Sequence, residues 1–489
     1  MSTVTNTLNN WSKQYIGGEW KEGNSQISYT NQNPFDQSSL VSIKLASIGD
    51  IDASYKEAKQ AHIQWQQQDP SERAAIMKKA AEVVESLREE IVNALILETG
   101  SSAIKANVEV DLAIADIQEF ASIPFKMNSE TRSSVIPGKE NRVYRLPVGV
   151  VGVISPFNFP FYLSMRAIAP ALAAGNGVVA KPDLQTFISG GLIIAKVFEK
   201  AGLPKGLFNV VVADIAEIGD AFVEHPIPQV ISFTGSTAVG RRIGELCGKH
   251  LKRAALELGG NNVMIVLDDA DVNQAASAAV FGKFLHQGQI CMSLNRIIVH
   301  RNIYNEFVQA FKEKAAALKV GNPADPEVFI GPLINERQVN KIKSWVNQSI
   351  EQGATCIQHG KISGTLVEPI ILTDVTNDMA VAQNELFGPV AAILPVDSEE
   401  EAIRIANESD FGLSGSVFTS DVEHGVNVAL QVHTGMIHVN DQSVNCEPNI
   451  PFGGEKSSGL GRYGGEWSLD EFTTLRWVSV QKQPRPFPF

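Results

Sequence analysis

A repeated alternation of short apolar segments, glycine turns and helical segments fills the chain from residue 148 to residue 267. Strand, helix and strand at this spacing indicate βαβ units, whose parallel strands build a sheet covered by helices on both faces. A second series starts near Val263–Leu267 and runs to about Phe418. The pattern therefore predicts an α/β fold. The strands predicted in the first series are Val148–Ile154, Gly177–Ala180, Phe208–Val212 and Gln229–Thr234, and the helices are Met165–Ala174, Ser189–Ala201 and Gly240–His250.

The segments outside these units follow other patterns. Two glycines at the centre of Gln14–Trp20 predict a hairpin. Apolar and charged residues at helical spacing predict a long helical stretch over Ile51–Glu98, which is interrupted at Pro70 and ended by Gly100. Two further strands are predicted at Arg142–Leu146 and Phe472–Gln481.

The composition excludes several classes of protein. Hydrophobic residues make up 44% and charged residues 19% of the 489 residues, as in globular domains. A net charge of −13 argues against a nucleic-acid or anionic-membrane partner, because both require a positive surface. No apolar run approaches the ~20 residues of a membrane span, and the N-terminus lacks a signal-peptide pattern. Four cysteines without metal-ligand spacing predict no disulfide framework and no metal site, so we expect a cytoplasmic protein.

Two of the four cysteines lie in polar surroundings that suit a nucleophile. Cys291 lies in HQGQICMSLNR, where Gly288 allows close approach, and Cys446 lies in the polar loop NDQSVNCEPN. Cys247 and Cys356 lie in a helical and a strand-like segment and are predicted to be small hydrophobic residues of the core. The local sequence leaves Cys291 and Cys446 as alternatives.

A glycine-rich turn, GSTAVG at residues 235–240, lies between a predicted strand and a predicted helix. Such a turn lets backbone amides and a helix N-terminus approach a pyrophosphate. The middle glycine of the dinucleotide fingerprint is missing, so an ordinary tight turn explains the pattern equally well. Glu257 lies about 20 residues further on, where the fingerprint places a ribose ligand. Its place in LELGGNN also suits a desolvated general base or a plain surface turn.

The segment SPFNFP, residues 155–160, directly follows the predicted strand Val148–Ile154. Residues just past the carboxyl end of a strand face the ligand crevice of an α/β sheet. Asn158 could therefore donate a hydrogen bond to a developing oxyanion. An Asx turn between two prolines is the other explanation for this asparagine.

Seven segments together resemble the NAD(P)-dependent aldehyde dehydrogenase superfamily in order and spacing. They are SPFNFP, AGNGVVAKP, FTGSTAVG, LELGGNN, GQICMSLNR, NELFGPV and PFGGEKSSGLGR, and the resemblance covers nearly the whole chain. It implies an aldehyde-dehydrogenase-like α/β fold with a doubly wound Rossmann-type cofactor domain, an α/β catalytic domain and a small β oligomerisation flap. The implied domains are 1–126 with 148–258 for the cofactor, 259–465 for catalysis, and 127–147 with 466–489 for the flap.

The same resemblance assigns roles to single residues. It places the catalytic cysteine at Cys291, the general base at Glu257 and the oxyanion amide at Asn158, so Glu257 is expected to act in catalysis and not on a ribose. The implied cofactor is NAD, NADP or both, and the positions implied to bind it are Ser155, Phe157, Lys181, Gly235, Ser236, Glu385 and Phe387.

The implied reaction is the oxidation of an aldehyde to a carboxylic acid. Cys291 attacks the aldehyde to give a thiohemiacetal, while Asn158 and the backbone N–H of Cys291 hold the oxyanion. Hydride transfer to the nicotinamide leaves a thioester, which water activated by Glu257 hydrolyses. The presence of Glu257 favours hydrolysis over acyl transfer to coenzyme A, because superfamily members that use coenzyme A generally lack that base. A non-catalytic relative that acts as a binding or structural protein is disfavoured, since Cys291 and Glu257 are both present.

One position departs from the pattern of many NAD-preferring relatives. They carry a glutamate three residues after the lysine of AKP, where it holds the adenosine ribose, and this chain has Leu184 there. Without that carboxylate a 2′-phosphate meets less repulsion, so we expect use of both NAD and NADP. Asp183, one residue earlier, could compensate.

The segment NDQSVNCEPNIPFGG, and more weakly KPDLQT, resembles the subgroup that acts on benzaldehyde, vanillin and salicylaldehyde. Phe157, Phe161 and Tyr162 are predicted to pack against an aromatic ring, and Cys446 is predicted at the substrate mouth. Arg166, one helical turn past Tyr162, is a candidate to bind a phenolic oxygen, and a solvated surface arginine is the other explanation. The competing enzyme is a semialdehyde or aliphatic-aldehyde dehydrogenase, in which Arg166 would bind a distal carboxylate.

The implied flap also predicts a partner. Its C-terminal strand has an unpaired edge, and such an edge is stabilised when another strand or subunit covers it. We therefore expect a homodimer or homotetramer that binds a small-molecule aldehyde, with no nucleic-acid or membrane partner.

Overall fold

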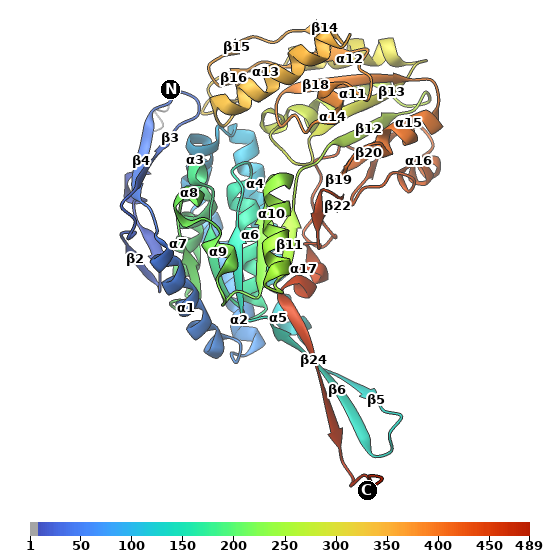
Figure 1. Ribbon diagram of the computed structural model, residues 1–489. Coiled ribbons are helices and arrows are strands. Elements are labelled where there is room, and N and C mark those ends of the chain that lie inside the picture. Colours follow the sequence, from blue (N-terminus) through green and yellow to red (C-terminus); the bar gives the residue numbers. More distant parts are fainter. Residues whose placement is uncertain (1–7) are drawn as a thin grey trace.

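Two α/β lobes and a protruding arm make up the molecule (Figure 1). The computed structural model describes residues 8–489, so the first seven residues of the predicted cofactor domain lie outside the described part. The first lobe is built on an eight-stranded sheet, the second lobe on a seven-stranded sheet, and the arm on three strands. This arrangement confirms the predicted α/β fold.

The predicted parallel sheet lies at the centre of the first lobe. Its order is β2-β1-β9-β8-β7-β10-β11-β23, parallel from β9 to β11 and antiparallel at both edges. β1 and β2 form the predicted hairpin, and β23 reaches this sheet from within residues 259–465. The bounds are β1 (Gln14–Ile16), β2 (Glu19–Lys21), β7 (Val150–Ile154), β8 (Gly177–Lys181), β9 (Phe208–Val210), β10 (Val230–Thr234), β11 (Arg253–Glu257) and β23 (Gly459–Leu460).

Helices cover both faces of this sheet, as the βαβ pattern requires. On one face lie α1 (Ile48–Trp65), α9 (Ala221–Glu224) and α10 (Thr237–Lys249). On the other face α6 (Pro160–Ala173) and α7 (Ile193–Ala201) contact the strands, and α2 (Pro70–Ser86) and α4 (Ala103–Phe120) pack on these helices. The largest hydrophobic core lies on the α6 side. The short helices and α3 complete this lobe: α3 (Arg88–Thr99), α5 (Ile123–Lys126) and α8 (Ile215–Ile218).

Several helix boundaries differ from those predicted. The stretch over Ile51–Glu98 is three helices, because Leu87 separates α2 from α3, and Gly100 ends α3 in the left-handed conformation as expected. Helix α6 begins at Pro160, five residues earlier than predicted, since a proline suits the first turn of a helix. The helix predicted from residue 189 opens with one π-helical turn over Ile188–Leu192.

The second βαβ series forms the second lobe. Its sheet order is β14-β17-β18-β13-β12-β20-β21, with α11 and α12 covering one core and α13 to α16 the other. The strands are β12 (Asn262–Val266), β13 (Leu294–His300), β14 (Thr355–Gln358), β17 (Ile370–Thr373), β18 (Val390–Val396), β20 (Gly415–Phe418) and β21 (His438–Val439). The helices are α11 (Val272–Phe284), α12 (Tyr304–Ala316), α13 (Glu336–Glu351), α14 (Ala380–Gln383), α15 (Glu399–Asn407) and α16 (Val422–Ala429).

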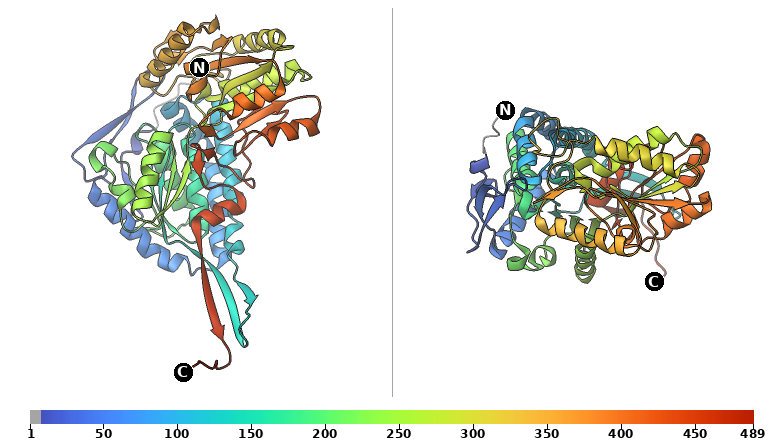
Figure 2. Two further views of the ribbon diagram at one scale, coloured as in Figure 1. Left: turned by 45° about the vertical axis from the view of Figure 1, so that its right-hand side comes forward. Right: turned by 90° about the horizontal axis from the view of Figure 1, so that it is seen from above.

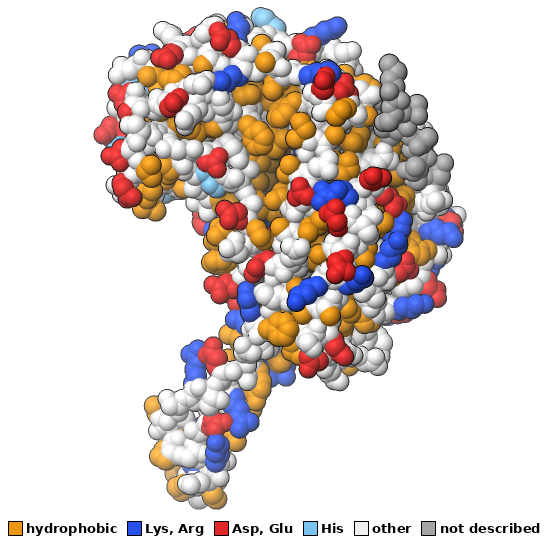
Figure 3. All heavy atoms as spheres, turned by 180° about the vertical axis from the view of Figure 1, so that it is seen from behind, with side chains coloured by type: hydrophobic (Ala, Val, Ile, Leu, Met, Phe, Trp, Pro, Cys, Tyr) orange, Lys and Arg blue, Asp and Glu red, His pale blue; other side chains and the backbone are white. Residues whose placement is uncertain are grey.

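The arm joins two segments that lie far apart in the sequence. β6 (Lys139–Pro147) pairs along its whole length with β24 (Thr473–Gln481), and β5 (Glu130–Ser133) pairs with the other side of β6. The arm projects away from both lobes in Figure 1 and in the left view of Figure 2. Charged side chains of both signs are spread over it, whereas hydrophobic side chains gather between the lobes on the face in Figure 3. Strand β24 is one edge of this sheet.

Short elements connect the lobes and the arm. α17 (Gly465–Phe472) leads directly into β24, and three pairs of short strands lie outside the three main sheets. These pairs are β3 (Ser28–Gln32) with β4 (Ser39–Lys44), β15 (Ile362–Ser363) with β16 (Leu366–Val367), and β19 (Phe411–Gly412) with β22 (Glu455–Lys456). Within residues 8–489 no helix has both the length and the apolar character needed to span a membrane.

Candidate active site

The carboxyl ends of four neighbouring strands bring together most of the residues predicted to bind the cofactor. Ile154 is paired with Lys181 across β7 and β8, and Thr234 is paired with Glu257 across β10 and β11. Ser155 follows β7 and donates its backbone N–H to the Lys181 carbonyl (3.3 Å). These residues therefore lie along one edge of the sheet, where ligands bind in open α/β sheets.

The turn before α10 leaves an open helix N-terminus at this edge. Ser236 is the N-cap residue, but its side chain makes no capping hydrogen bond. The backbone N–H of Gly235 donates to the Glu257 carbonyl (3.0 Å), and a Cβ at Gly235 would lie 2.5 Å from the Phe233 ring. The hydroxyl of Ser155 is buried without a hydrogen-bond partner. Unsatisfied donors at a helix N-terminus suit a pyrophosphate, so these residues fit a dinucleotide.

Lys181 lies at the end of β8, followed by Asp183 and Leu184, the two residues that bear on the choice between NAD and NADP. Burial lowers the pKa of Lys181, and the carboxylates of Asp183 and Asp214 oppose that shift. The Asp183 carboxylate accepts a hydrogen bond from the backbone N–H of Gln185 (2.8 Å), so it caps the short 3₁₀ helix η2 (Leu184–Thr186). One oxygen of Asp183, the acid that could replace the missing glutamate at position 184, is therefore already engaged in a hydrogen bond to its own loop.

Residues from the second lobe complete the cofactor candidates. The backbone N–H of Gly260 donates to the Glu385 carboxylate (2.9 Å), and burial raises the pKa of Glu385 to about 7. The rings of Phe157 and Phe387 meet edge to face, with centroids 5.8 Å apart. Phe387 has a left-handed backbone (φ 51°), and its carbonyl accepts a hydrogen bond from the Gln338 amide (3.0 Å). The structure thus brings two distant motifs together at the junction of the lobes.

Cys291 lies on a loop that follows the strained 3₁₀ turn η4 (Leu285–Gly288). His286 and Gln287 both have positive φ angles, near 50° and 58°, which side chains other than glycine rarely adopt. The Asn262 amide donates to the carbonyls of Cys291 (2.6 Å) and Ser293 (2.8 Å) and so fixes the loop on the other side. Strain held by surrounding contacts is typical of a functional loop.

The Cys291 thiol is half-buried. Its pKa is raised to about 12, mainly by burial and also by the carboxylates of Glu257 and Glu385, while the Arg166 guanidinium acts to lower it. Cys446, the other candidate, is also half-buried, with its pKa raised to about 11 by burial. Only Cys291 lies on a loop held by the LELGGNN segment, through Asn262.

Glu257 is a buried carboxylic acid and not a residue of a surface turn. Its exposure is 2%, and one carboxylate oxygen has no hydrogen-bond partner. The other oxygen lies 3.8 Å from Nη2 of Arg166. Burial raises the pKa of Glu257 to about 8, although the Arg166 guanidinium acts in the opposite direction. A carboxyl group with a pKa in this range and a free oxygen can act as a general base.

The Asn158 side chain reaches across to the Cys291 loop. Its amide nitrogen donates to the carbonyl of Gln289 (3.0 Å), two residues before Cys291, and the whole residue is buried. This long-range contact replaces the local Asx turn considered from sequence. Because an amide nitrogen carries two donors, one N–H remains to serve an oxyanion formed at Cys291.

Arg166 is buried, so the solvated-arginine explanation is wrong. Its side chain is 4% exposed, and its guanidinium carbon lies 3.9 Å from the ring centroid of Phe452 and 5.2 Å from that of Tyr463. Burial acts to lower its pKa, but Tyr162 and Glu257 raise it above the usual value. Its Nη1 atom has no hydrogen-bond partner. The cation is therefore held by aromatic faces with one donor group free.

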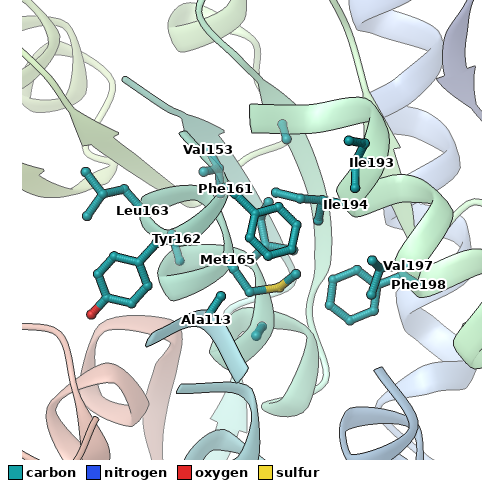
Figure 4. Close-up of a cluster of buried hydrophobic side chains, with 14 of the residues drawn as sticks. Ala113, Val153, Phe161, Tyr162, Leu163, Met165, Ile193, Ile194, Val197 and Phe198 are labelled. Carbon is teal, nitrogen blue, oxygen red and sulfur yellow. The ribbon is translucent and has the colours of Figure 1, made fainter. Parts of the chain in front are cut away.

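Tyr162 and Phe161 are neighbours in sequence but point to different sides of α6 (Figure 4). The hydroxyl of Tyr162 lies 2.6 Å from the sulfur of Cys446, which places both predicted substrate residues beside Arg166. Phe161 is completely buried and extends toward Met165 and Ile194 in the hydrophobic core (Figure 4). The expectation that Phe161 packs against a substrate ring is therefore not met.

The sequence reasoning missed the acid that faces this cluster. Asp116 on α4 is buried, and burial raises its pKa to about 7 while Arg166 and Tyr162 act to lower it. Lys105 and Glu109 on the same helix are also buried. Charged residues four and seven positions apart share one side of a helix with apolar residues between them, and that pattern was the available signal. In residues 8–489 no three metal-ligating side chains are grouped to hold an ion.

Comparison with known proteins agrees with this geometry. Residues 20–478 match the model of the aldehyde dehydrogenase family. Benzaldehyde dehydrogenase YfmT of Bacillus subtilis is 54% identical over 477 residues, which are 98% of each chain. Vanillin dehydrogenase of Corynebacterium glutamicum is 49% identical and covers 96% of this chain and 98% of its own. The crystal structure of a NAD-dependent benzaldehyde dehydrogenase from C. glutamicum has a TM-score of 0.89 at 46% identity, with 96% and 98% covered. The chain belongs to the aldehyde dehydrogenase family.

Proposed function

We propose that this aldehyde dehydrogenase oxidises aromatic aldehydes of the benzaldehyde and vanillin type to the carboxylic acids with NAD, NADP or both. The observation that carries the proposal is the meeting of the half-buried Cys291 with the buried Glu257 and Arg166, with aromatic side chains around the guanidinium. The names of the relatives support the aromatic substrate. A flat apolar ring with a phenolic oxygen matches a pocket of this composition.

The reaction begins when the Cys291 thiol releases its proton to solvent and the thiolate attacks the aldehyde carbon, which turns the carbonyl oxygen into an oxyanion. The free oxygen of Glu257 remains available for the later hydrolysis step. The spare N–H of Asn158 and the backbone N–H of Cys291 then stabilise the oxyanion, and such a donor is worth roughly 3–4 kcal/mol. After oxidation, Glu257 removes a proton from water, which attacks the thioester carbon and releases the acid and the thiol.

The cofactor is expected at the sheet edge described above. Ser155, Gly235 and Ser236 would hold its pyrophosphate, Lys181 its adenosine ribose, and Glu385 the ribose beside the nicotinamide. When bound, the dinucleotide supplies the hydride acceptor. The Phe157–Phe387 pair would form an apolar wall at that place, which excludes water from the reacting carbon. With Leu184 in place of a carboxylate, the acids that act on Lys181 are Asp183, whose carboxylate caps η2, and Asp214.

The quaternary structure and domain division belong to the same proposal. The edge of β24 exposes Leu475 and Trp477, at 61% and 66%, on an arm that protrudes from the lobes. We propose that a second subunit covers this edge in a homodimer or homotetramer, with residues 127–147 and 466–489 as the flap. Residues 1–126 and 148–258 would bind the cofactor, and residues 259–465 would supply Cys291. The four free thiols suit a cytoplasmic location.

The test is a kinetic comparison of four aldehydes with each cofactor. Reduced-nicotinamide absorbance is followed with benzaldehyde, vanillin, succinic semialdehyde and hexanal, and Cys291→Ala serves as the blank. We expect the highest kcat/KM for the two ring aldehydes, with turnover in both NAD and NADP. A higher kcat/KM for succinic semialdehyde would assign Arg166 to a distal carboxylate, and one for hexanal would refute the aromatic pocket. Absence of turnover with all four would contradict the proposed activity itself.

A further inference from the structure

A buried ion pair on α4 contacts the backbone of the segment that carries Asn158. Nζ of Lys105 donates to the carboxylate of Glu109 (2.5 Å) and to the carbonyl oxygen of Asn158 (2.6 Å). Both side chains of the pair have no exposed surface. Lys105 also lies over the ring of Phe159, 4.0 Å from its centroid. One cation therefore holds two consecutive residues of the SPFNFP segment.

The carboxylate of the pair holds the residues that follow. One oxygen of Glu109 accepts the backbone N–H groups of Phe161 (2.9 Å) and Tyr162 (3.2 Å), in the first turn of α6. The N-cap residue of α6 is Phe159, which has no side-chain acceptor. Glu109 thus caps α6 from another helix, and an anion is favoured at that position by the helix dipole.

The ring of Phe159 links this anchor to the loop of the nucleophile. It meets the ring of His286 edge to face, with centroids 5.7 Å apart. His286 is buried in the left-handed conformation, five residues before Cys291. The Asn158 amide touches the same loop at Gln289 (3.0 Å). The backbone of Asn158 is consequently tied to α4, and its side chain to the Cys291 loop.

We infer that Lys105 and Glu109 are positioning residues that aim the Asn158 amide at the oxyanion formed on Cys291. A buried ion pair has a large desolvation penalty, and replacing one with apolar residues is often neutral for stability. Here the hydrogen bonds that the pair makes outside itself all go to backbone atoms of residues 158–162. Loss of the anchor lets the peptide at Asn158 turn, and a displacement of about 1 Å in a catalytic group lowers the rate about 10²-fold.

The inference rests on the proposed function, so its test uses a reaction that needs the thiol, the oxyanion site and Glu257 but no cofactor. Cys291 attacks the carbonyl of p-nitrophenyl benzoate, nitrophenolate leaves, and water releases benzoate, without any cofactor. Wild-type enzyme, Lys105→Met, Asn158→Ala and the double variant are compared for kcat and KM in this hydrolysis and in benzaldehyde oxidation. The pair is also neutralised as a unit in Lys105→Met/Glu109→Gln, where the glutamine oxygen can still accept the α6 amides.

We expect Asn158→Ala to lower kcat about 10²–10³-fold and Lys105→Met about 10²-fold, with KM changed less than threefold in each. The double variant should be within about twofold of Asn158→Ala, because Lys105 acts through that amide. If the fold-loss of kcat in the double variant equals the product of the losses in the two single variants, the inference is overturned. A loss of kcat in Lys105→Met that is absent from Lys105→Met/Glu109→Gln would also overturn the inference, because that loss would come from the unpaired charge of Glu109.

A matched control separates positioning from general loss of stability. Lys196 and Glu90 form a half-buried ion pair (3.0 Å) between α7 and α3 and do not contact the site. Lys196→Met/Glu90→Gln should leave both reactions unchanged, and a loss equal to that of the Lys105 variants would overturn the inference. Wild-type ester hydrolysis without aldehyde oxidation would contradict the proposed function alone. Ester hydrolysis with normal kcat in Lys105→Met contradicts the positioning role alone.

Discussion

Replacing Arg166 by methionine should shift the pH dependence of thioester hydrolysis to higher pH. The guanidinium lies 3.8 Å from the Glu257 carboxylate, and both side chains are buried. Two opposite charges at about 4 Å attract by about 4 kcal/mol at an effective dielectric constant of 20, which corresponds to at most ~3 pKa units. Because Arg166 favours the ionised form of Glu257, its removal must raise the pKa of Glu257 above the present value of about 8.

The sign of the effect on rate follows from the role of Glu257. The base acts only as a carboxylate, so hydrolysis increases with pH and levels off above the pKa of Glu257. An upward shift of one unit lowers the ionised fraction at pH 7 about tenfold, and a larger shift lowers it further. The burst of reduced nicotinamide that precedes hydrolysis should remain, since acylation is complete before the base is needed for water.

The assay follows reduced-nicotinamide absorbance after rapid mixing with benzaldehyde between about pH 6 and pH 10. Arg166→Lys retains the charge and should return the profile part of the way toward wild type. Glu257→Gln should keep a single-turnover burst of reduced nicotinamide and lose the increase of the hydrolysis rate with pH. An Arg166→Met profile with an unchanged or lower apparent pKa, together with a normal burst, would refute the electrostatic argument.

Three further outcomes test other parts of the site. Cys291→Ala should abolish oxidation and ester hydrolysis, whereas Cys446→Ala should retain both with an altered KM for vanillin, as measured by steady-state kinetics. Leu184→Glu should lower kcat/KM with NADP at least tenfold and leave that with NAD nearly unchanged, because the new carboxylate repels a 2′-phosphate. Leu475→Lys on the edge of β24 should shift the oligomer toward monomer in size-exclusion chromatography with light scattering, while the thermal unfolding of the lobes stays unchanged.

The parallel sheet of the first lobe could be predicted because its strands are buried on both faces. Such strands read as short apolar runs between glycine turns, as VVGVI in β7 does. The residues just after each run must then meet at one edge of the sheet, so Ser155 and Gly235 could be placed there from the pattern, whereas Lys181 was assigned by the resemblance. Family motifs then separated Cys291 from Cys446, which local chemistry had left as equals.

The side chains on α6 could not be assigned from the sequence. Phe161 and Tyr162 differ by about 100° around a helix, so one faces the core when the other faces the site. Their orientation depends on where the helix begins, and its early start at Pro160 depends on a cap from Glu109, about 50 residues away. The burial of Arg166 is likewise decided by the packing of α4 on α6, which no local pattern encodes.

The arm has a consequence for the order in which the protein is made. Strand β6 leaves the ribosome with only β5 beside it, and its other partner, β24, is synthesised roughly 300 residues later. At translation rates of about 5–20 residues per second the wait lasts tens of seconds at the slow end. During that time the open side of β6 is available to any extended chain nearby, including a neighbouring nascent copy. Strand β24 is therefore the last strand of the arm to be made, and the arm can be completed only after the sequence of both lobes has been synthesised.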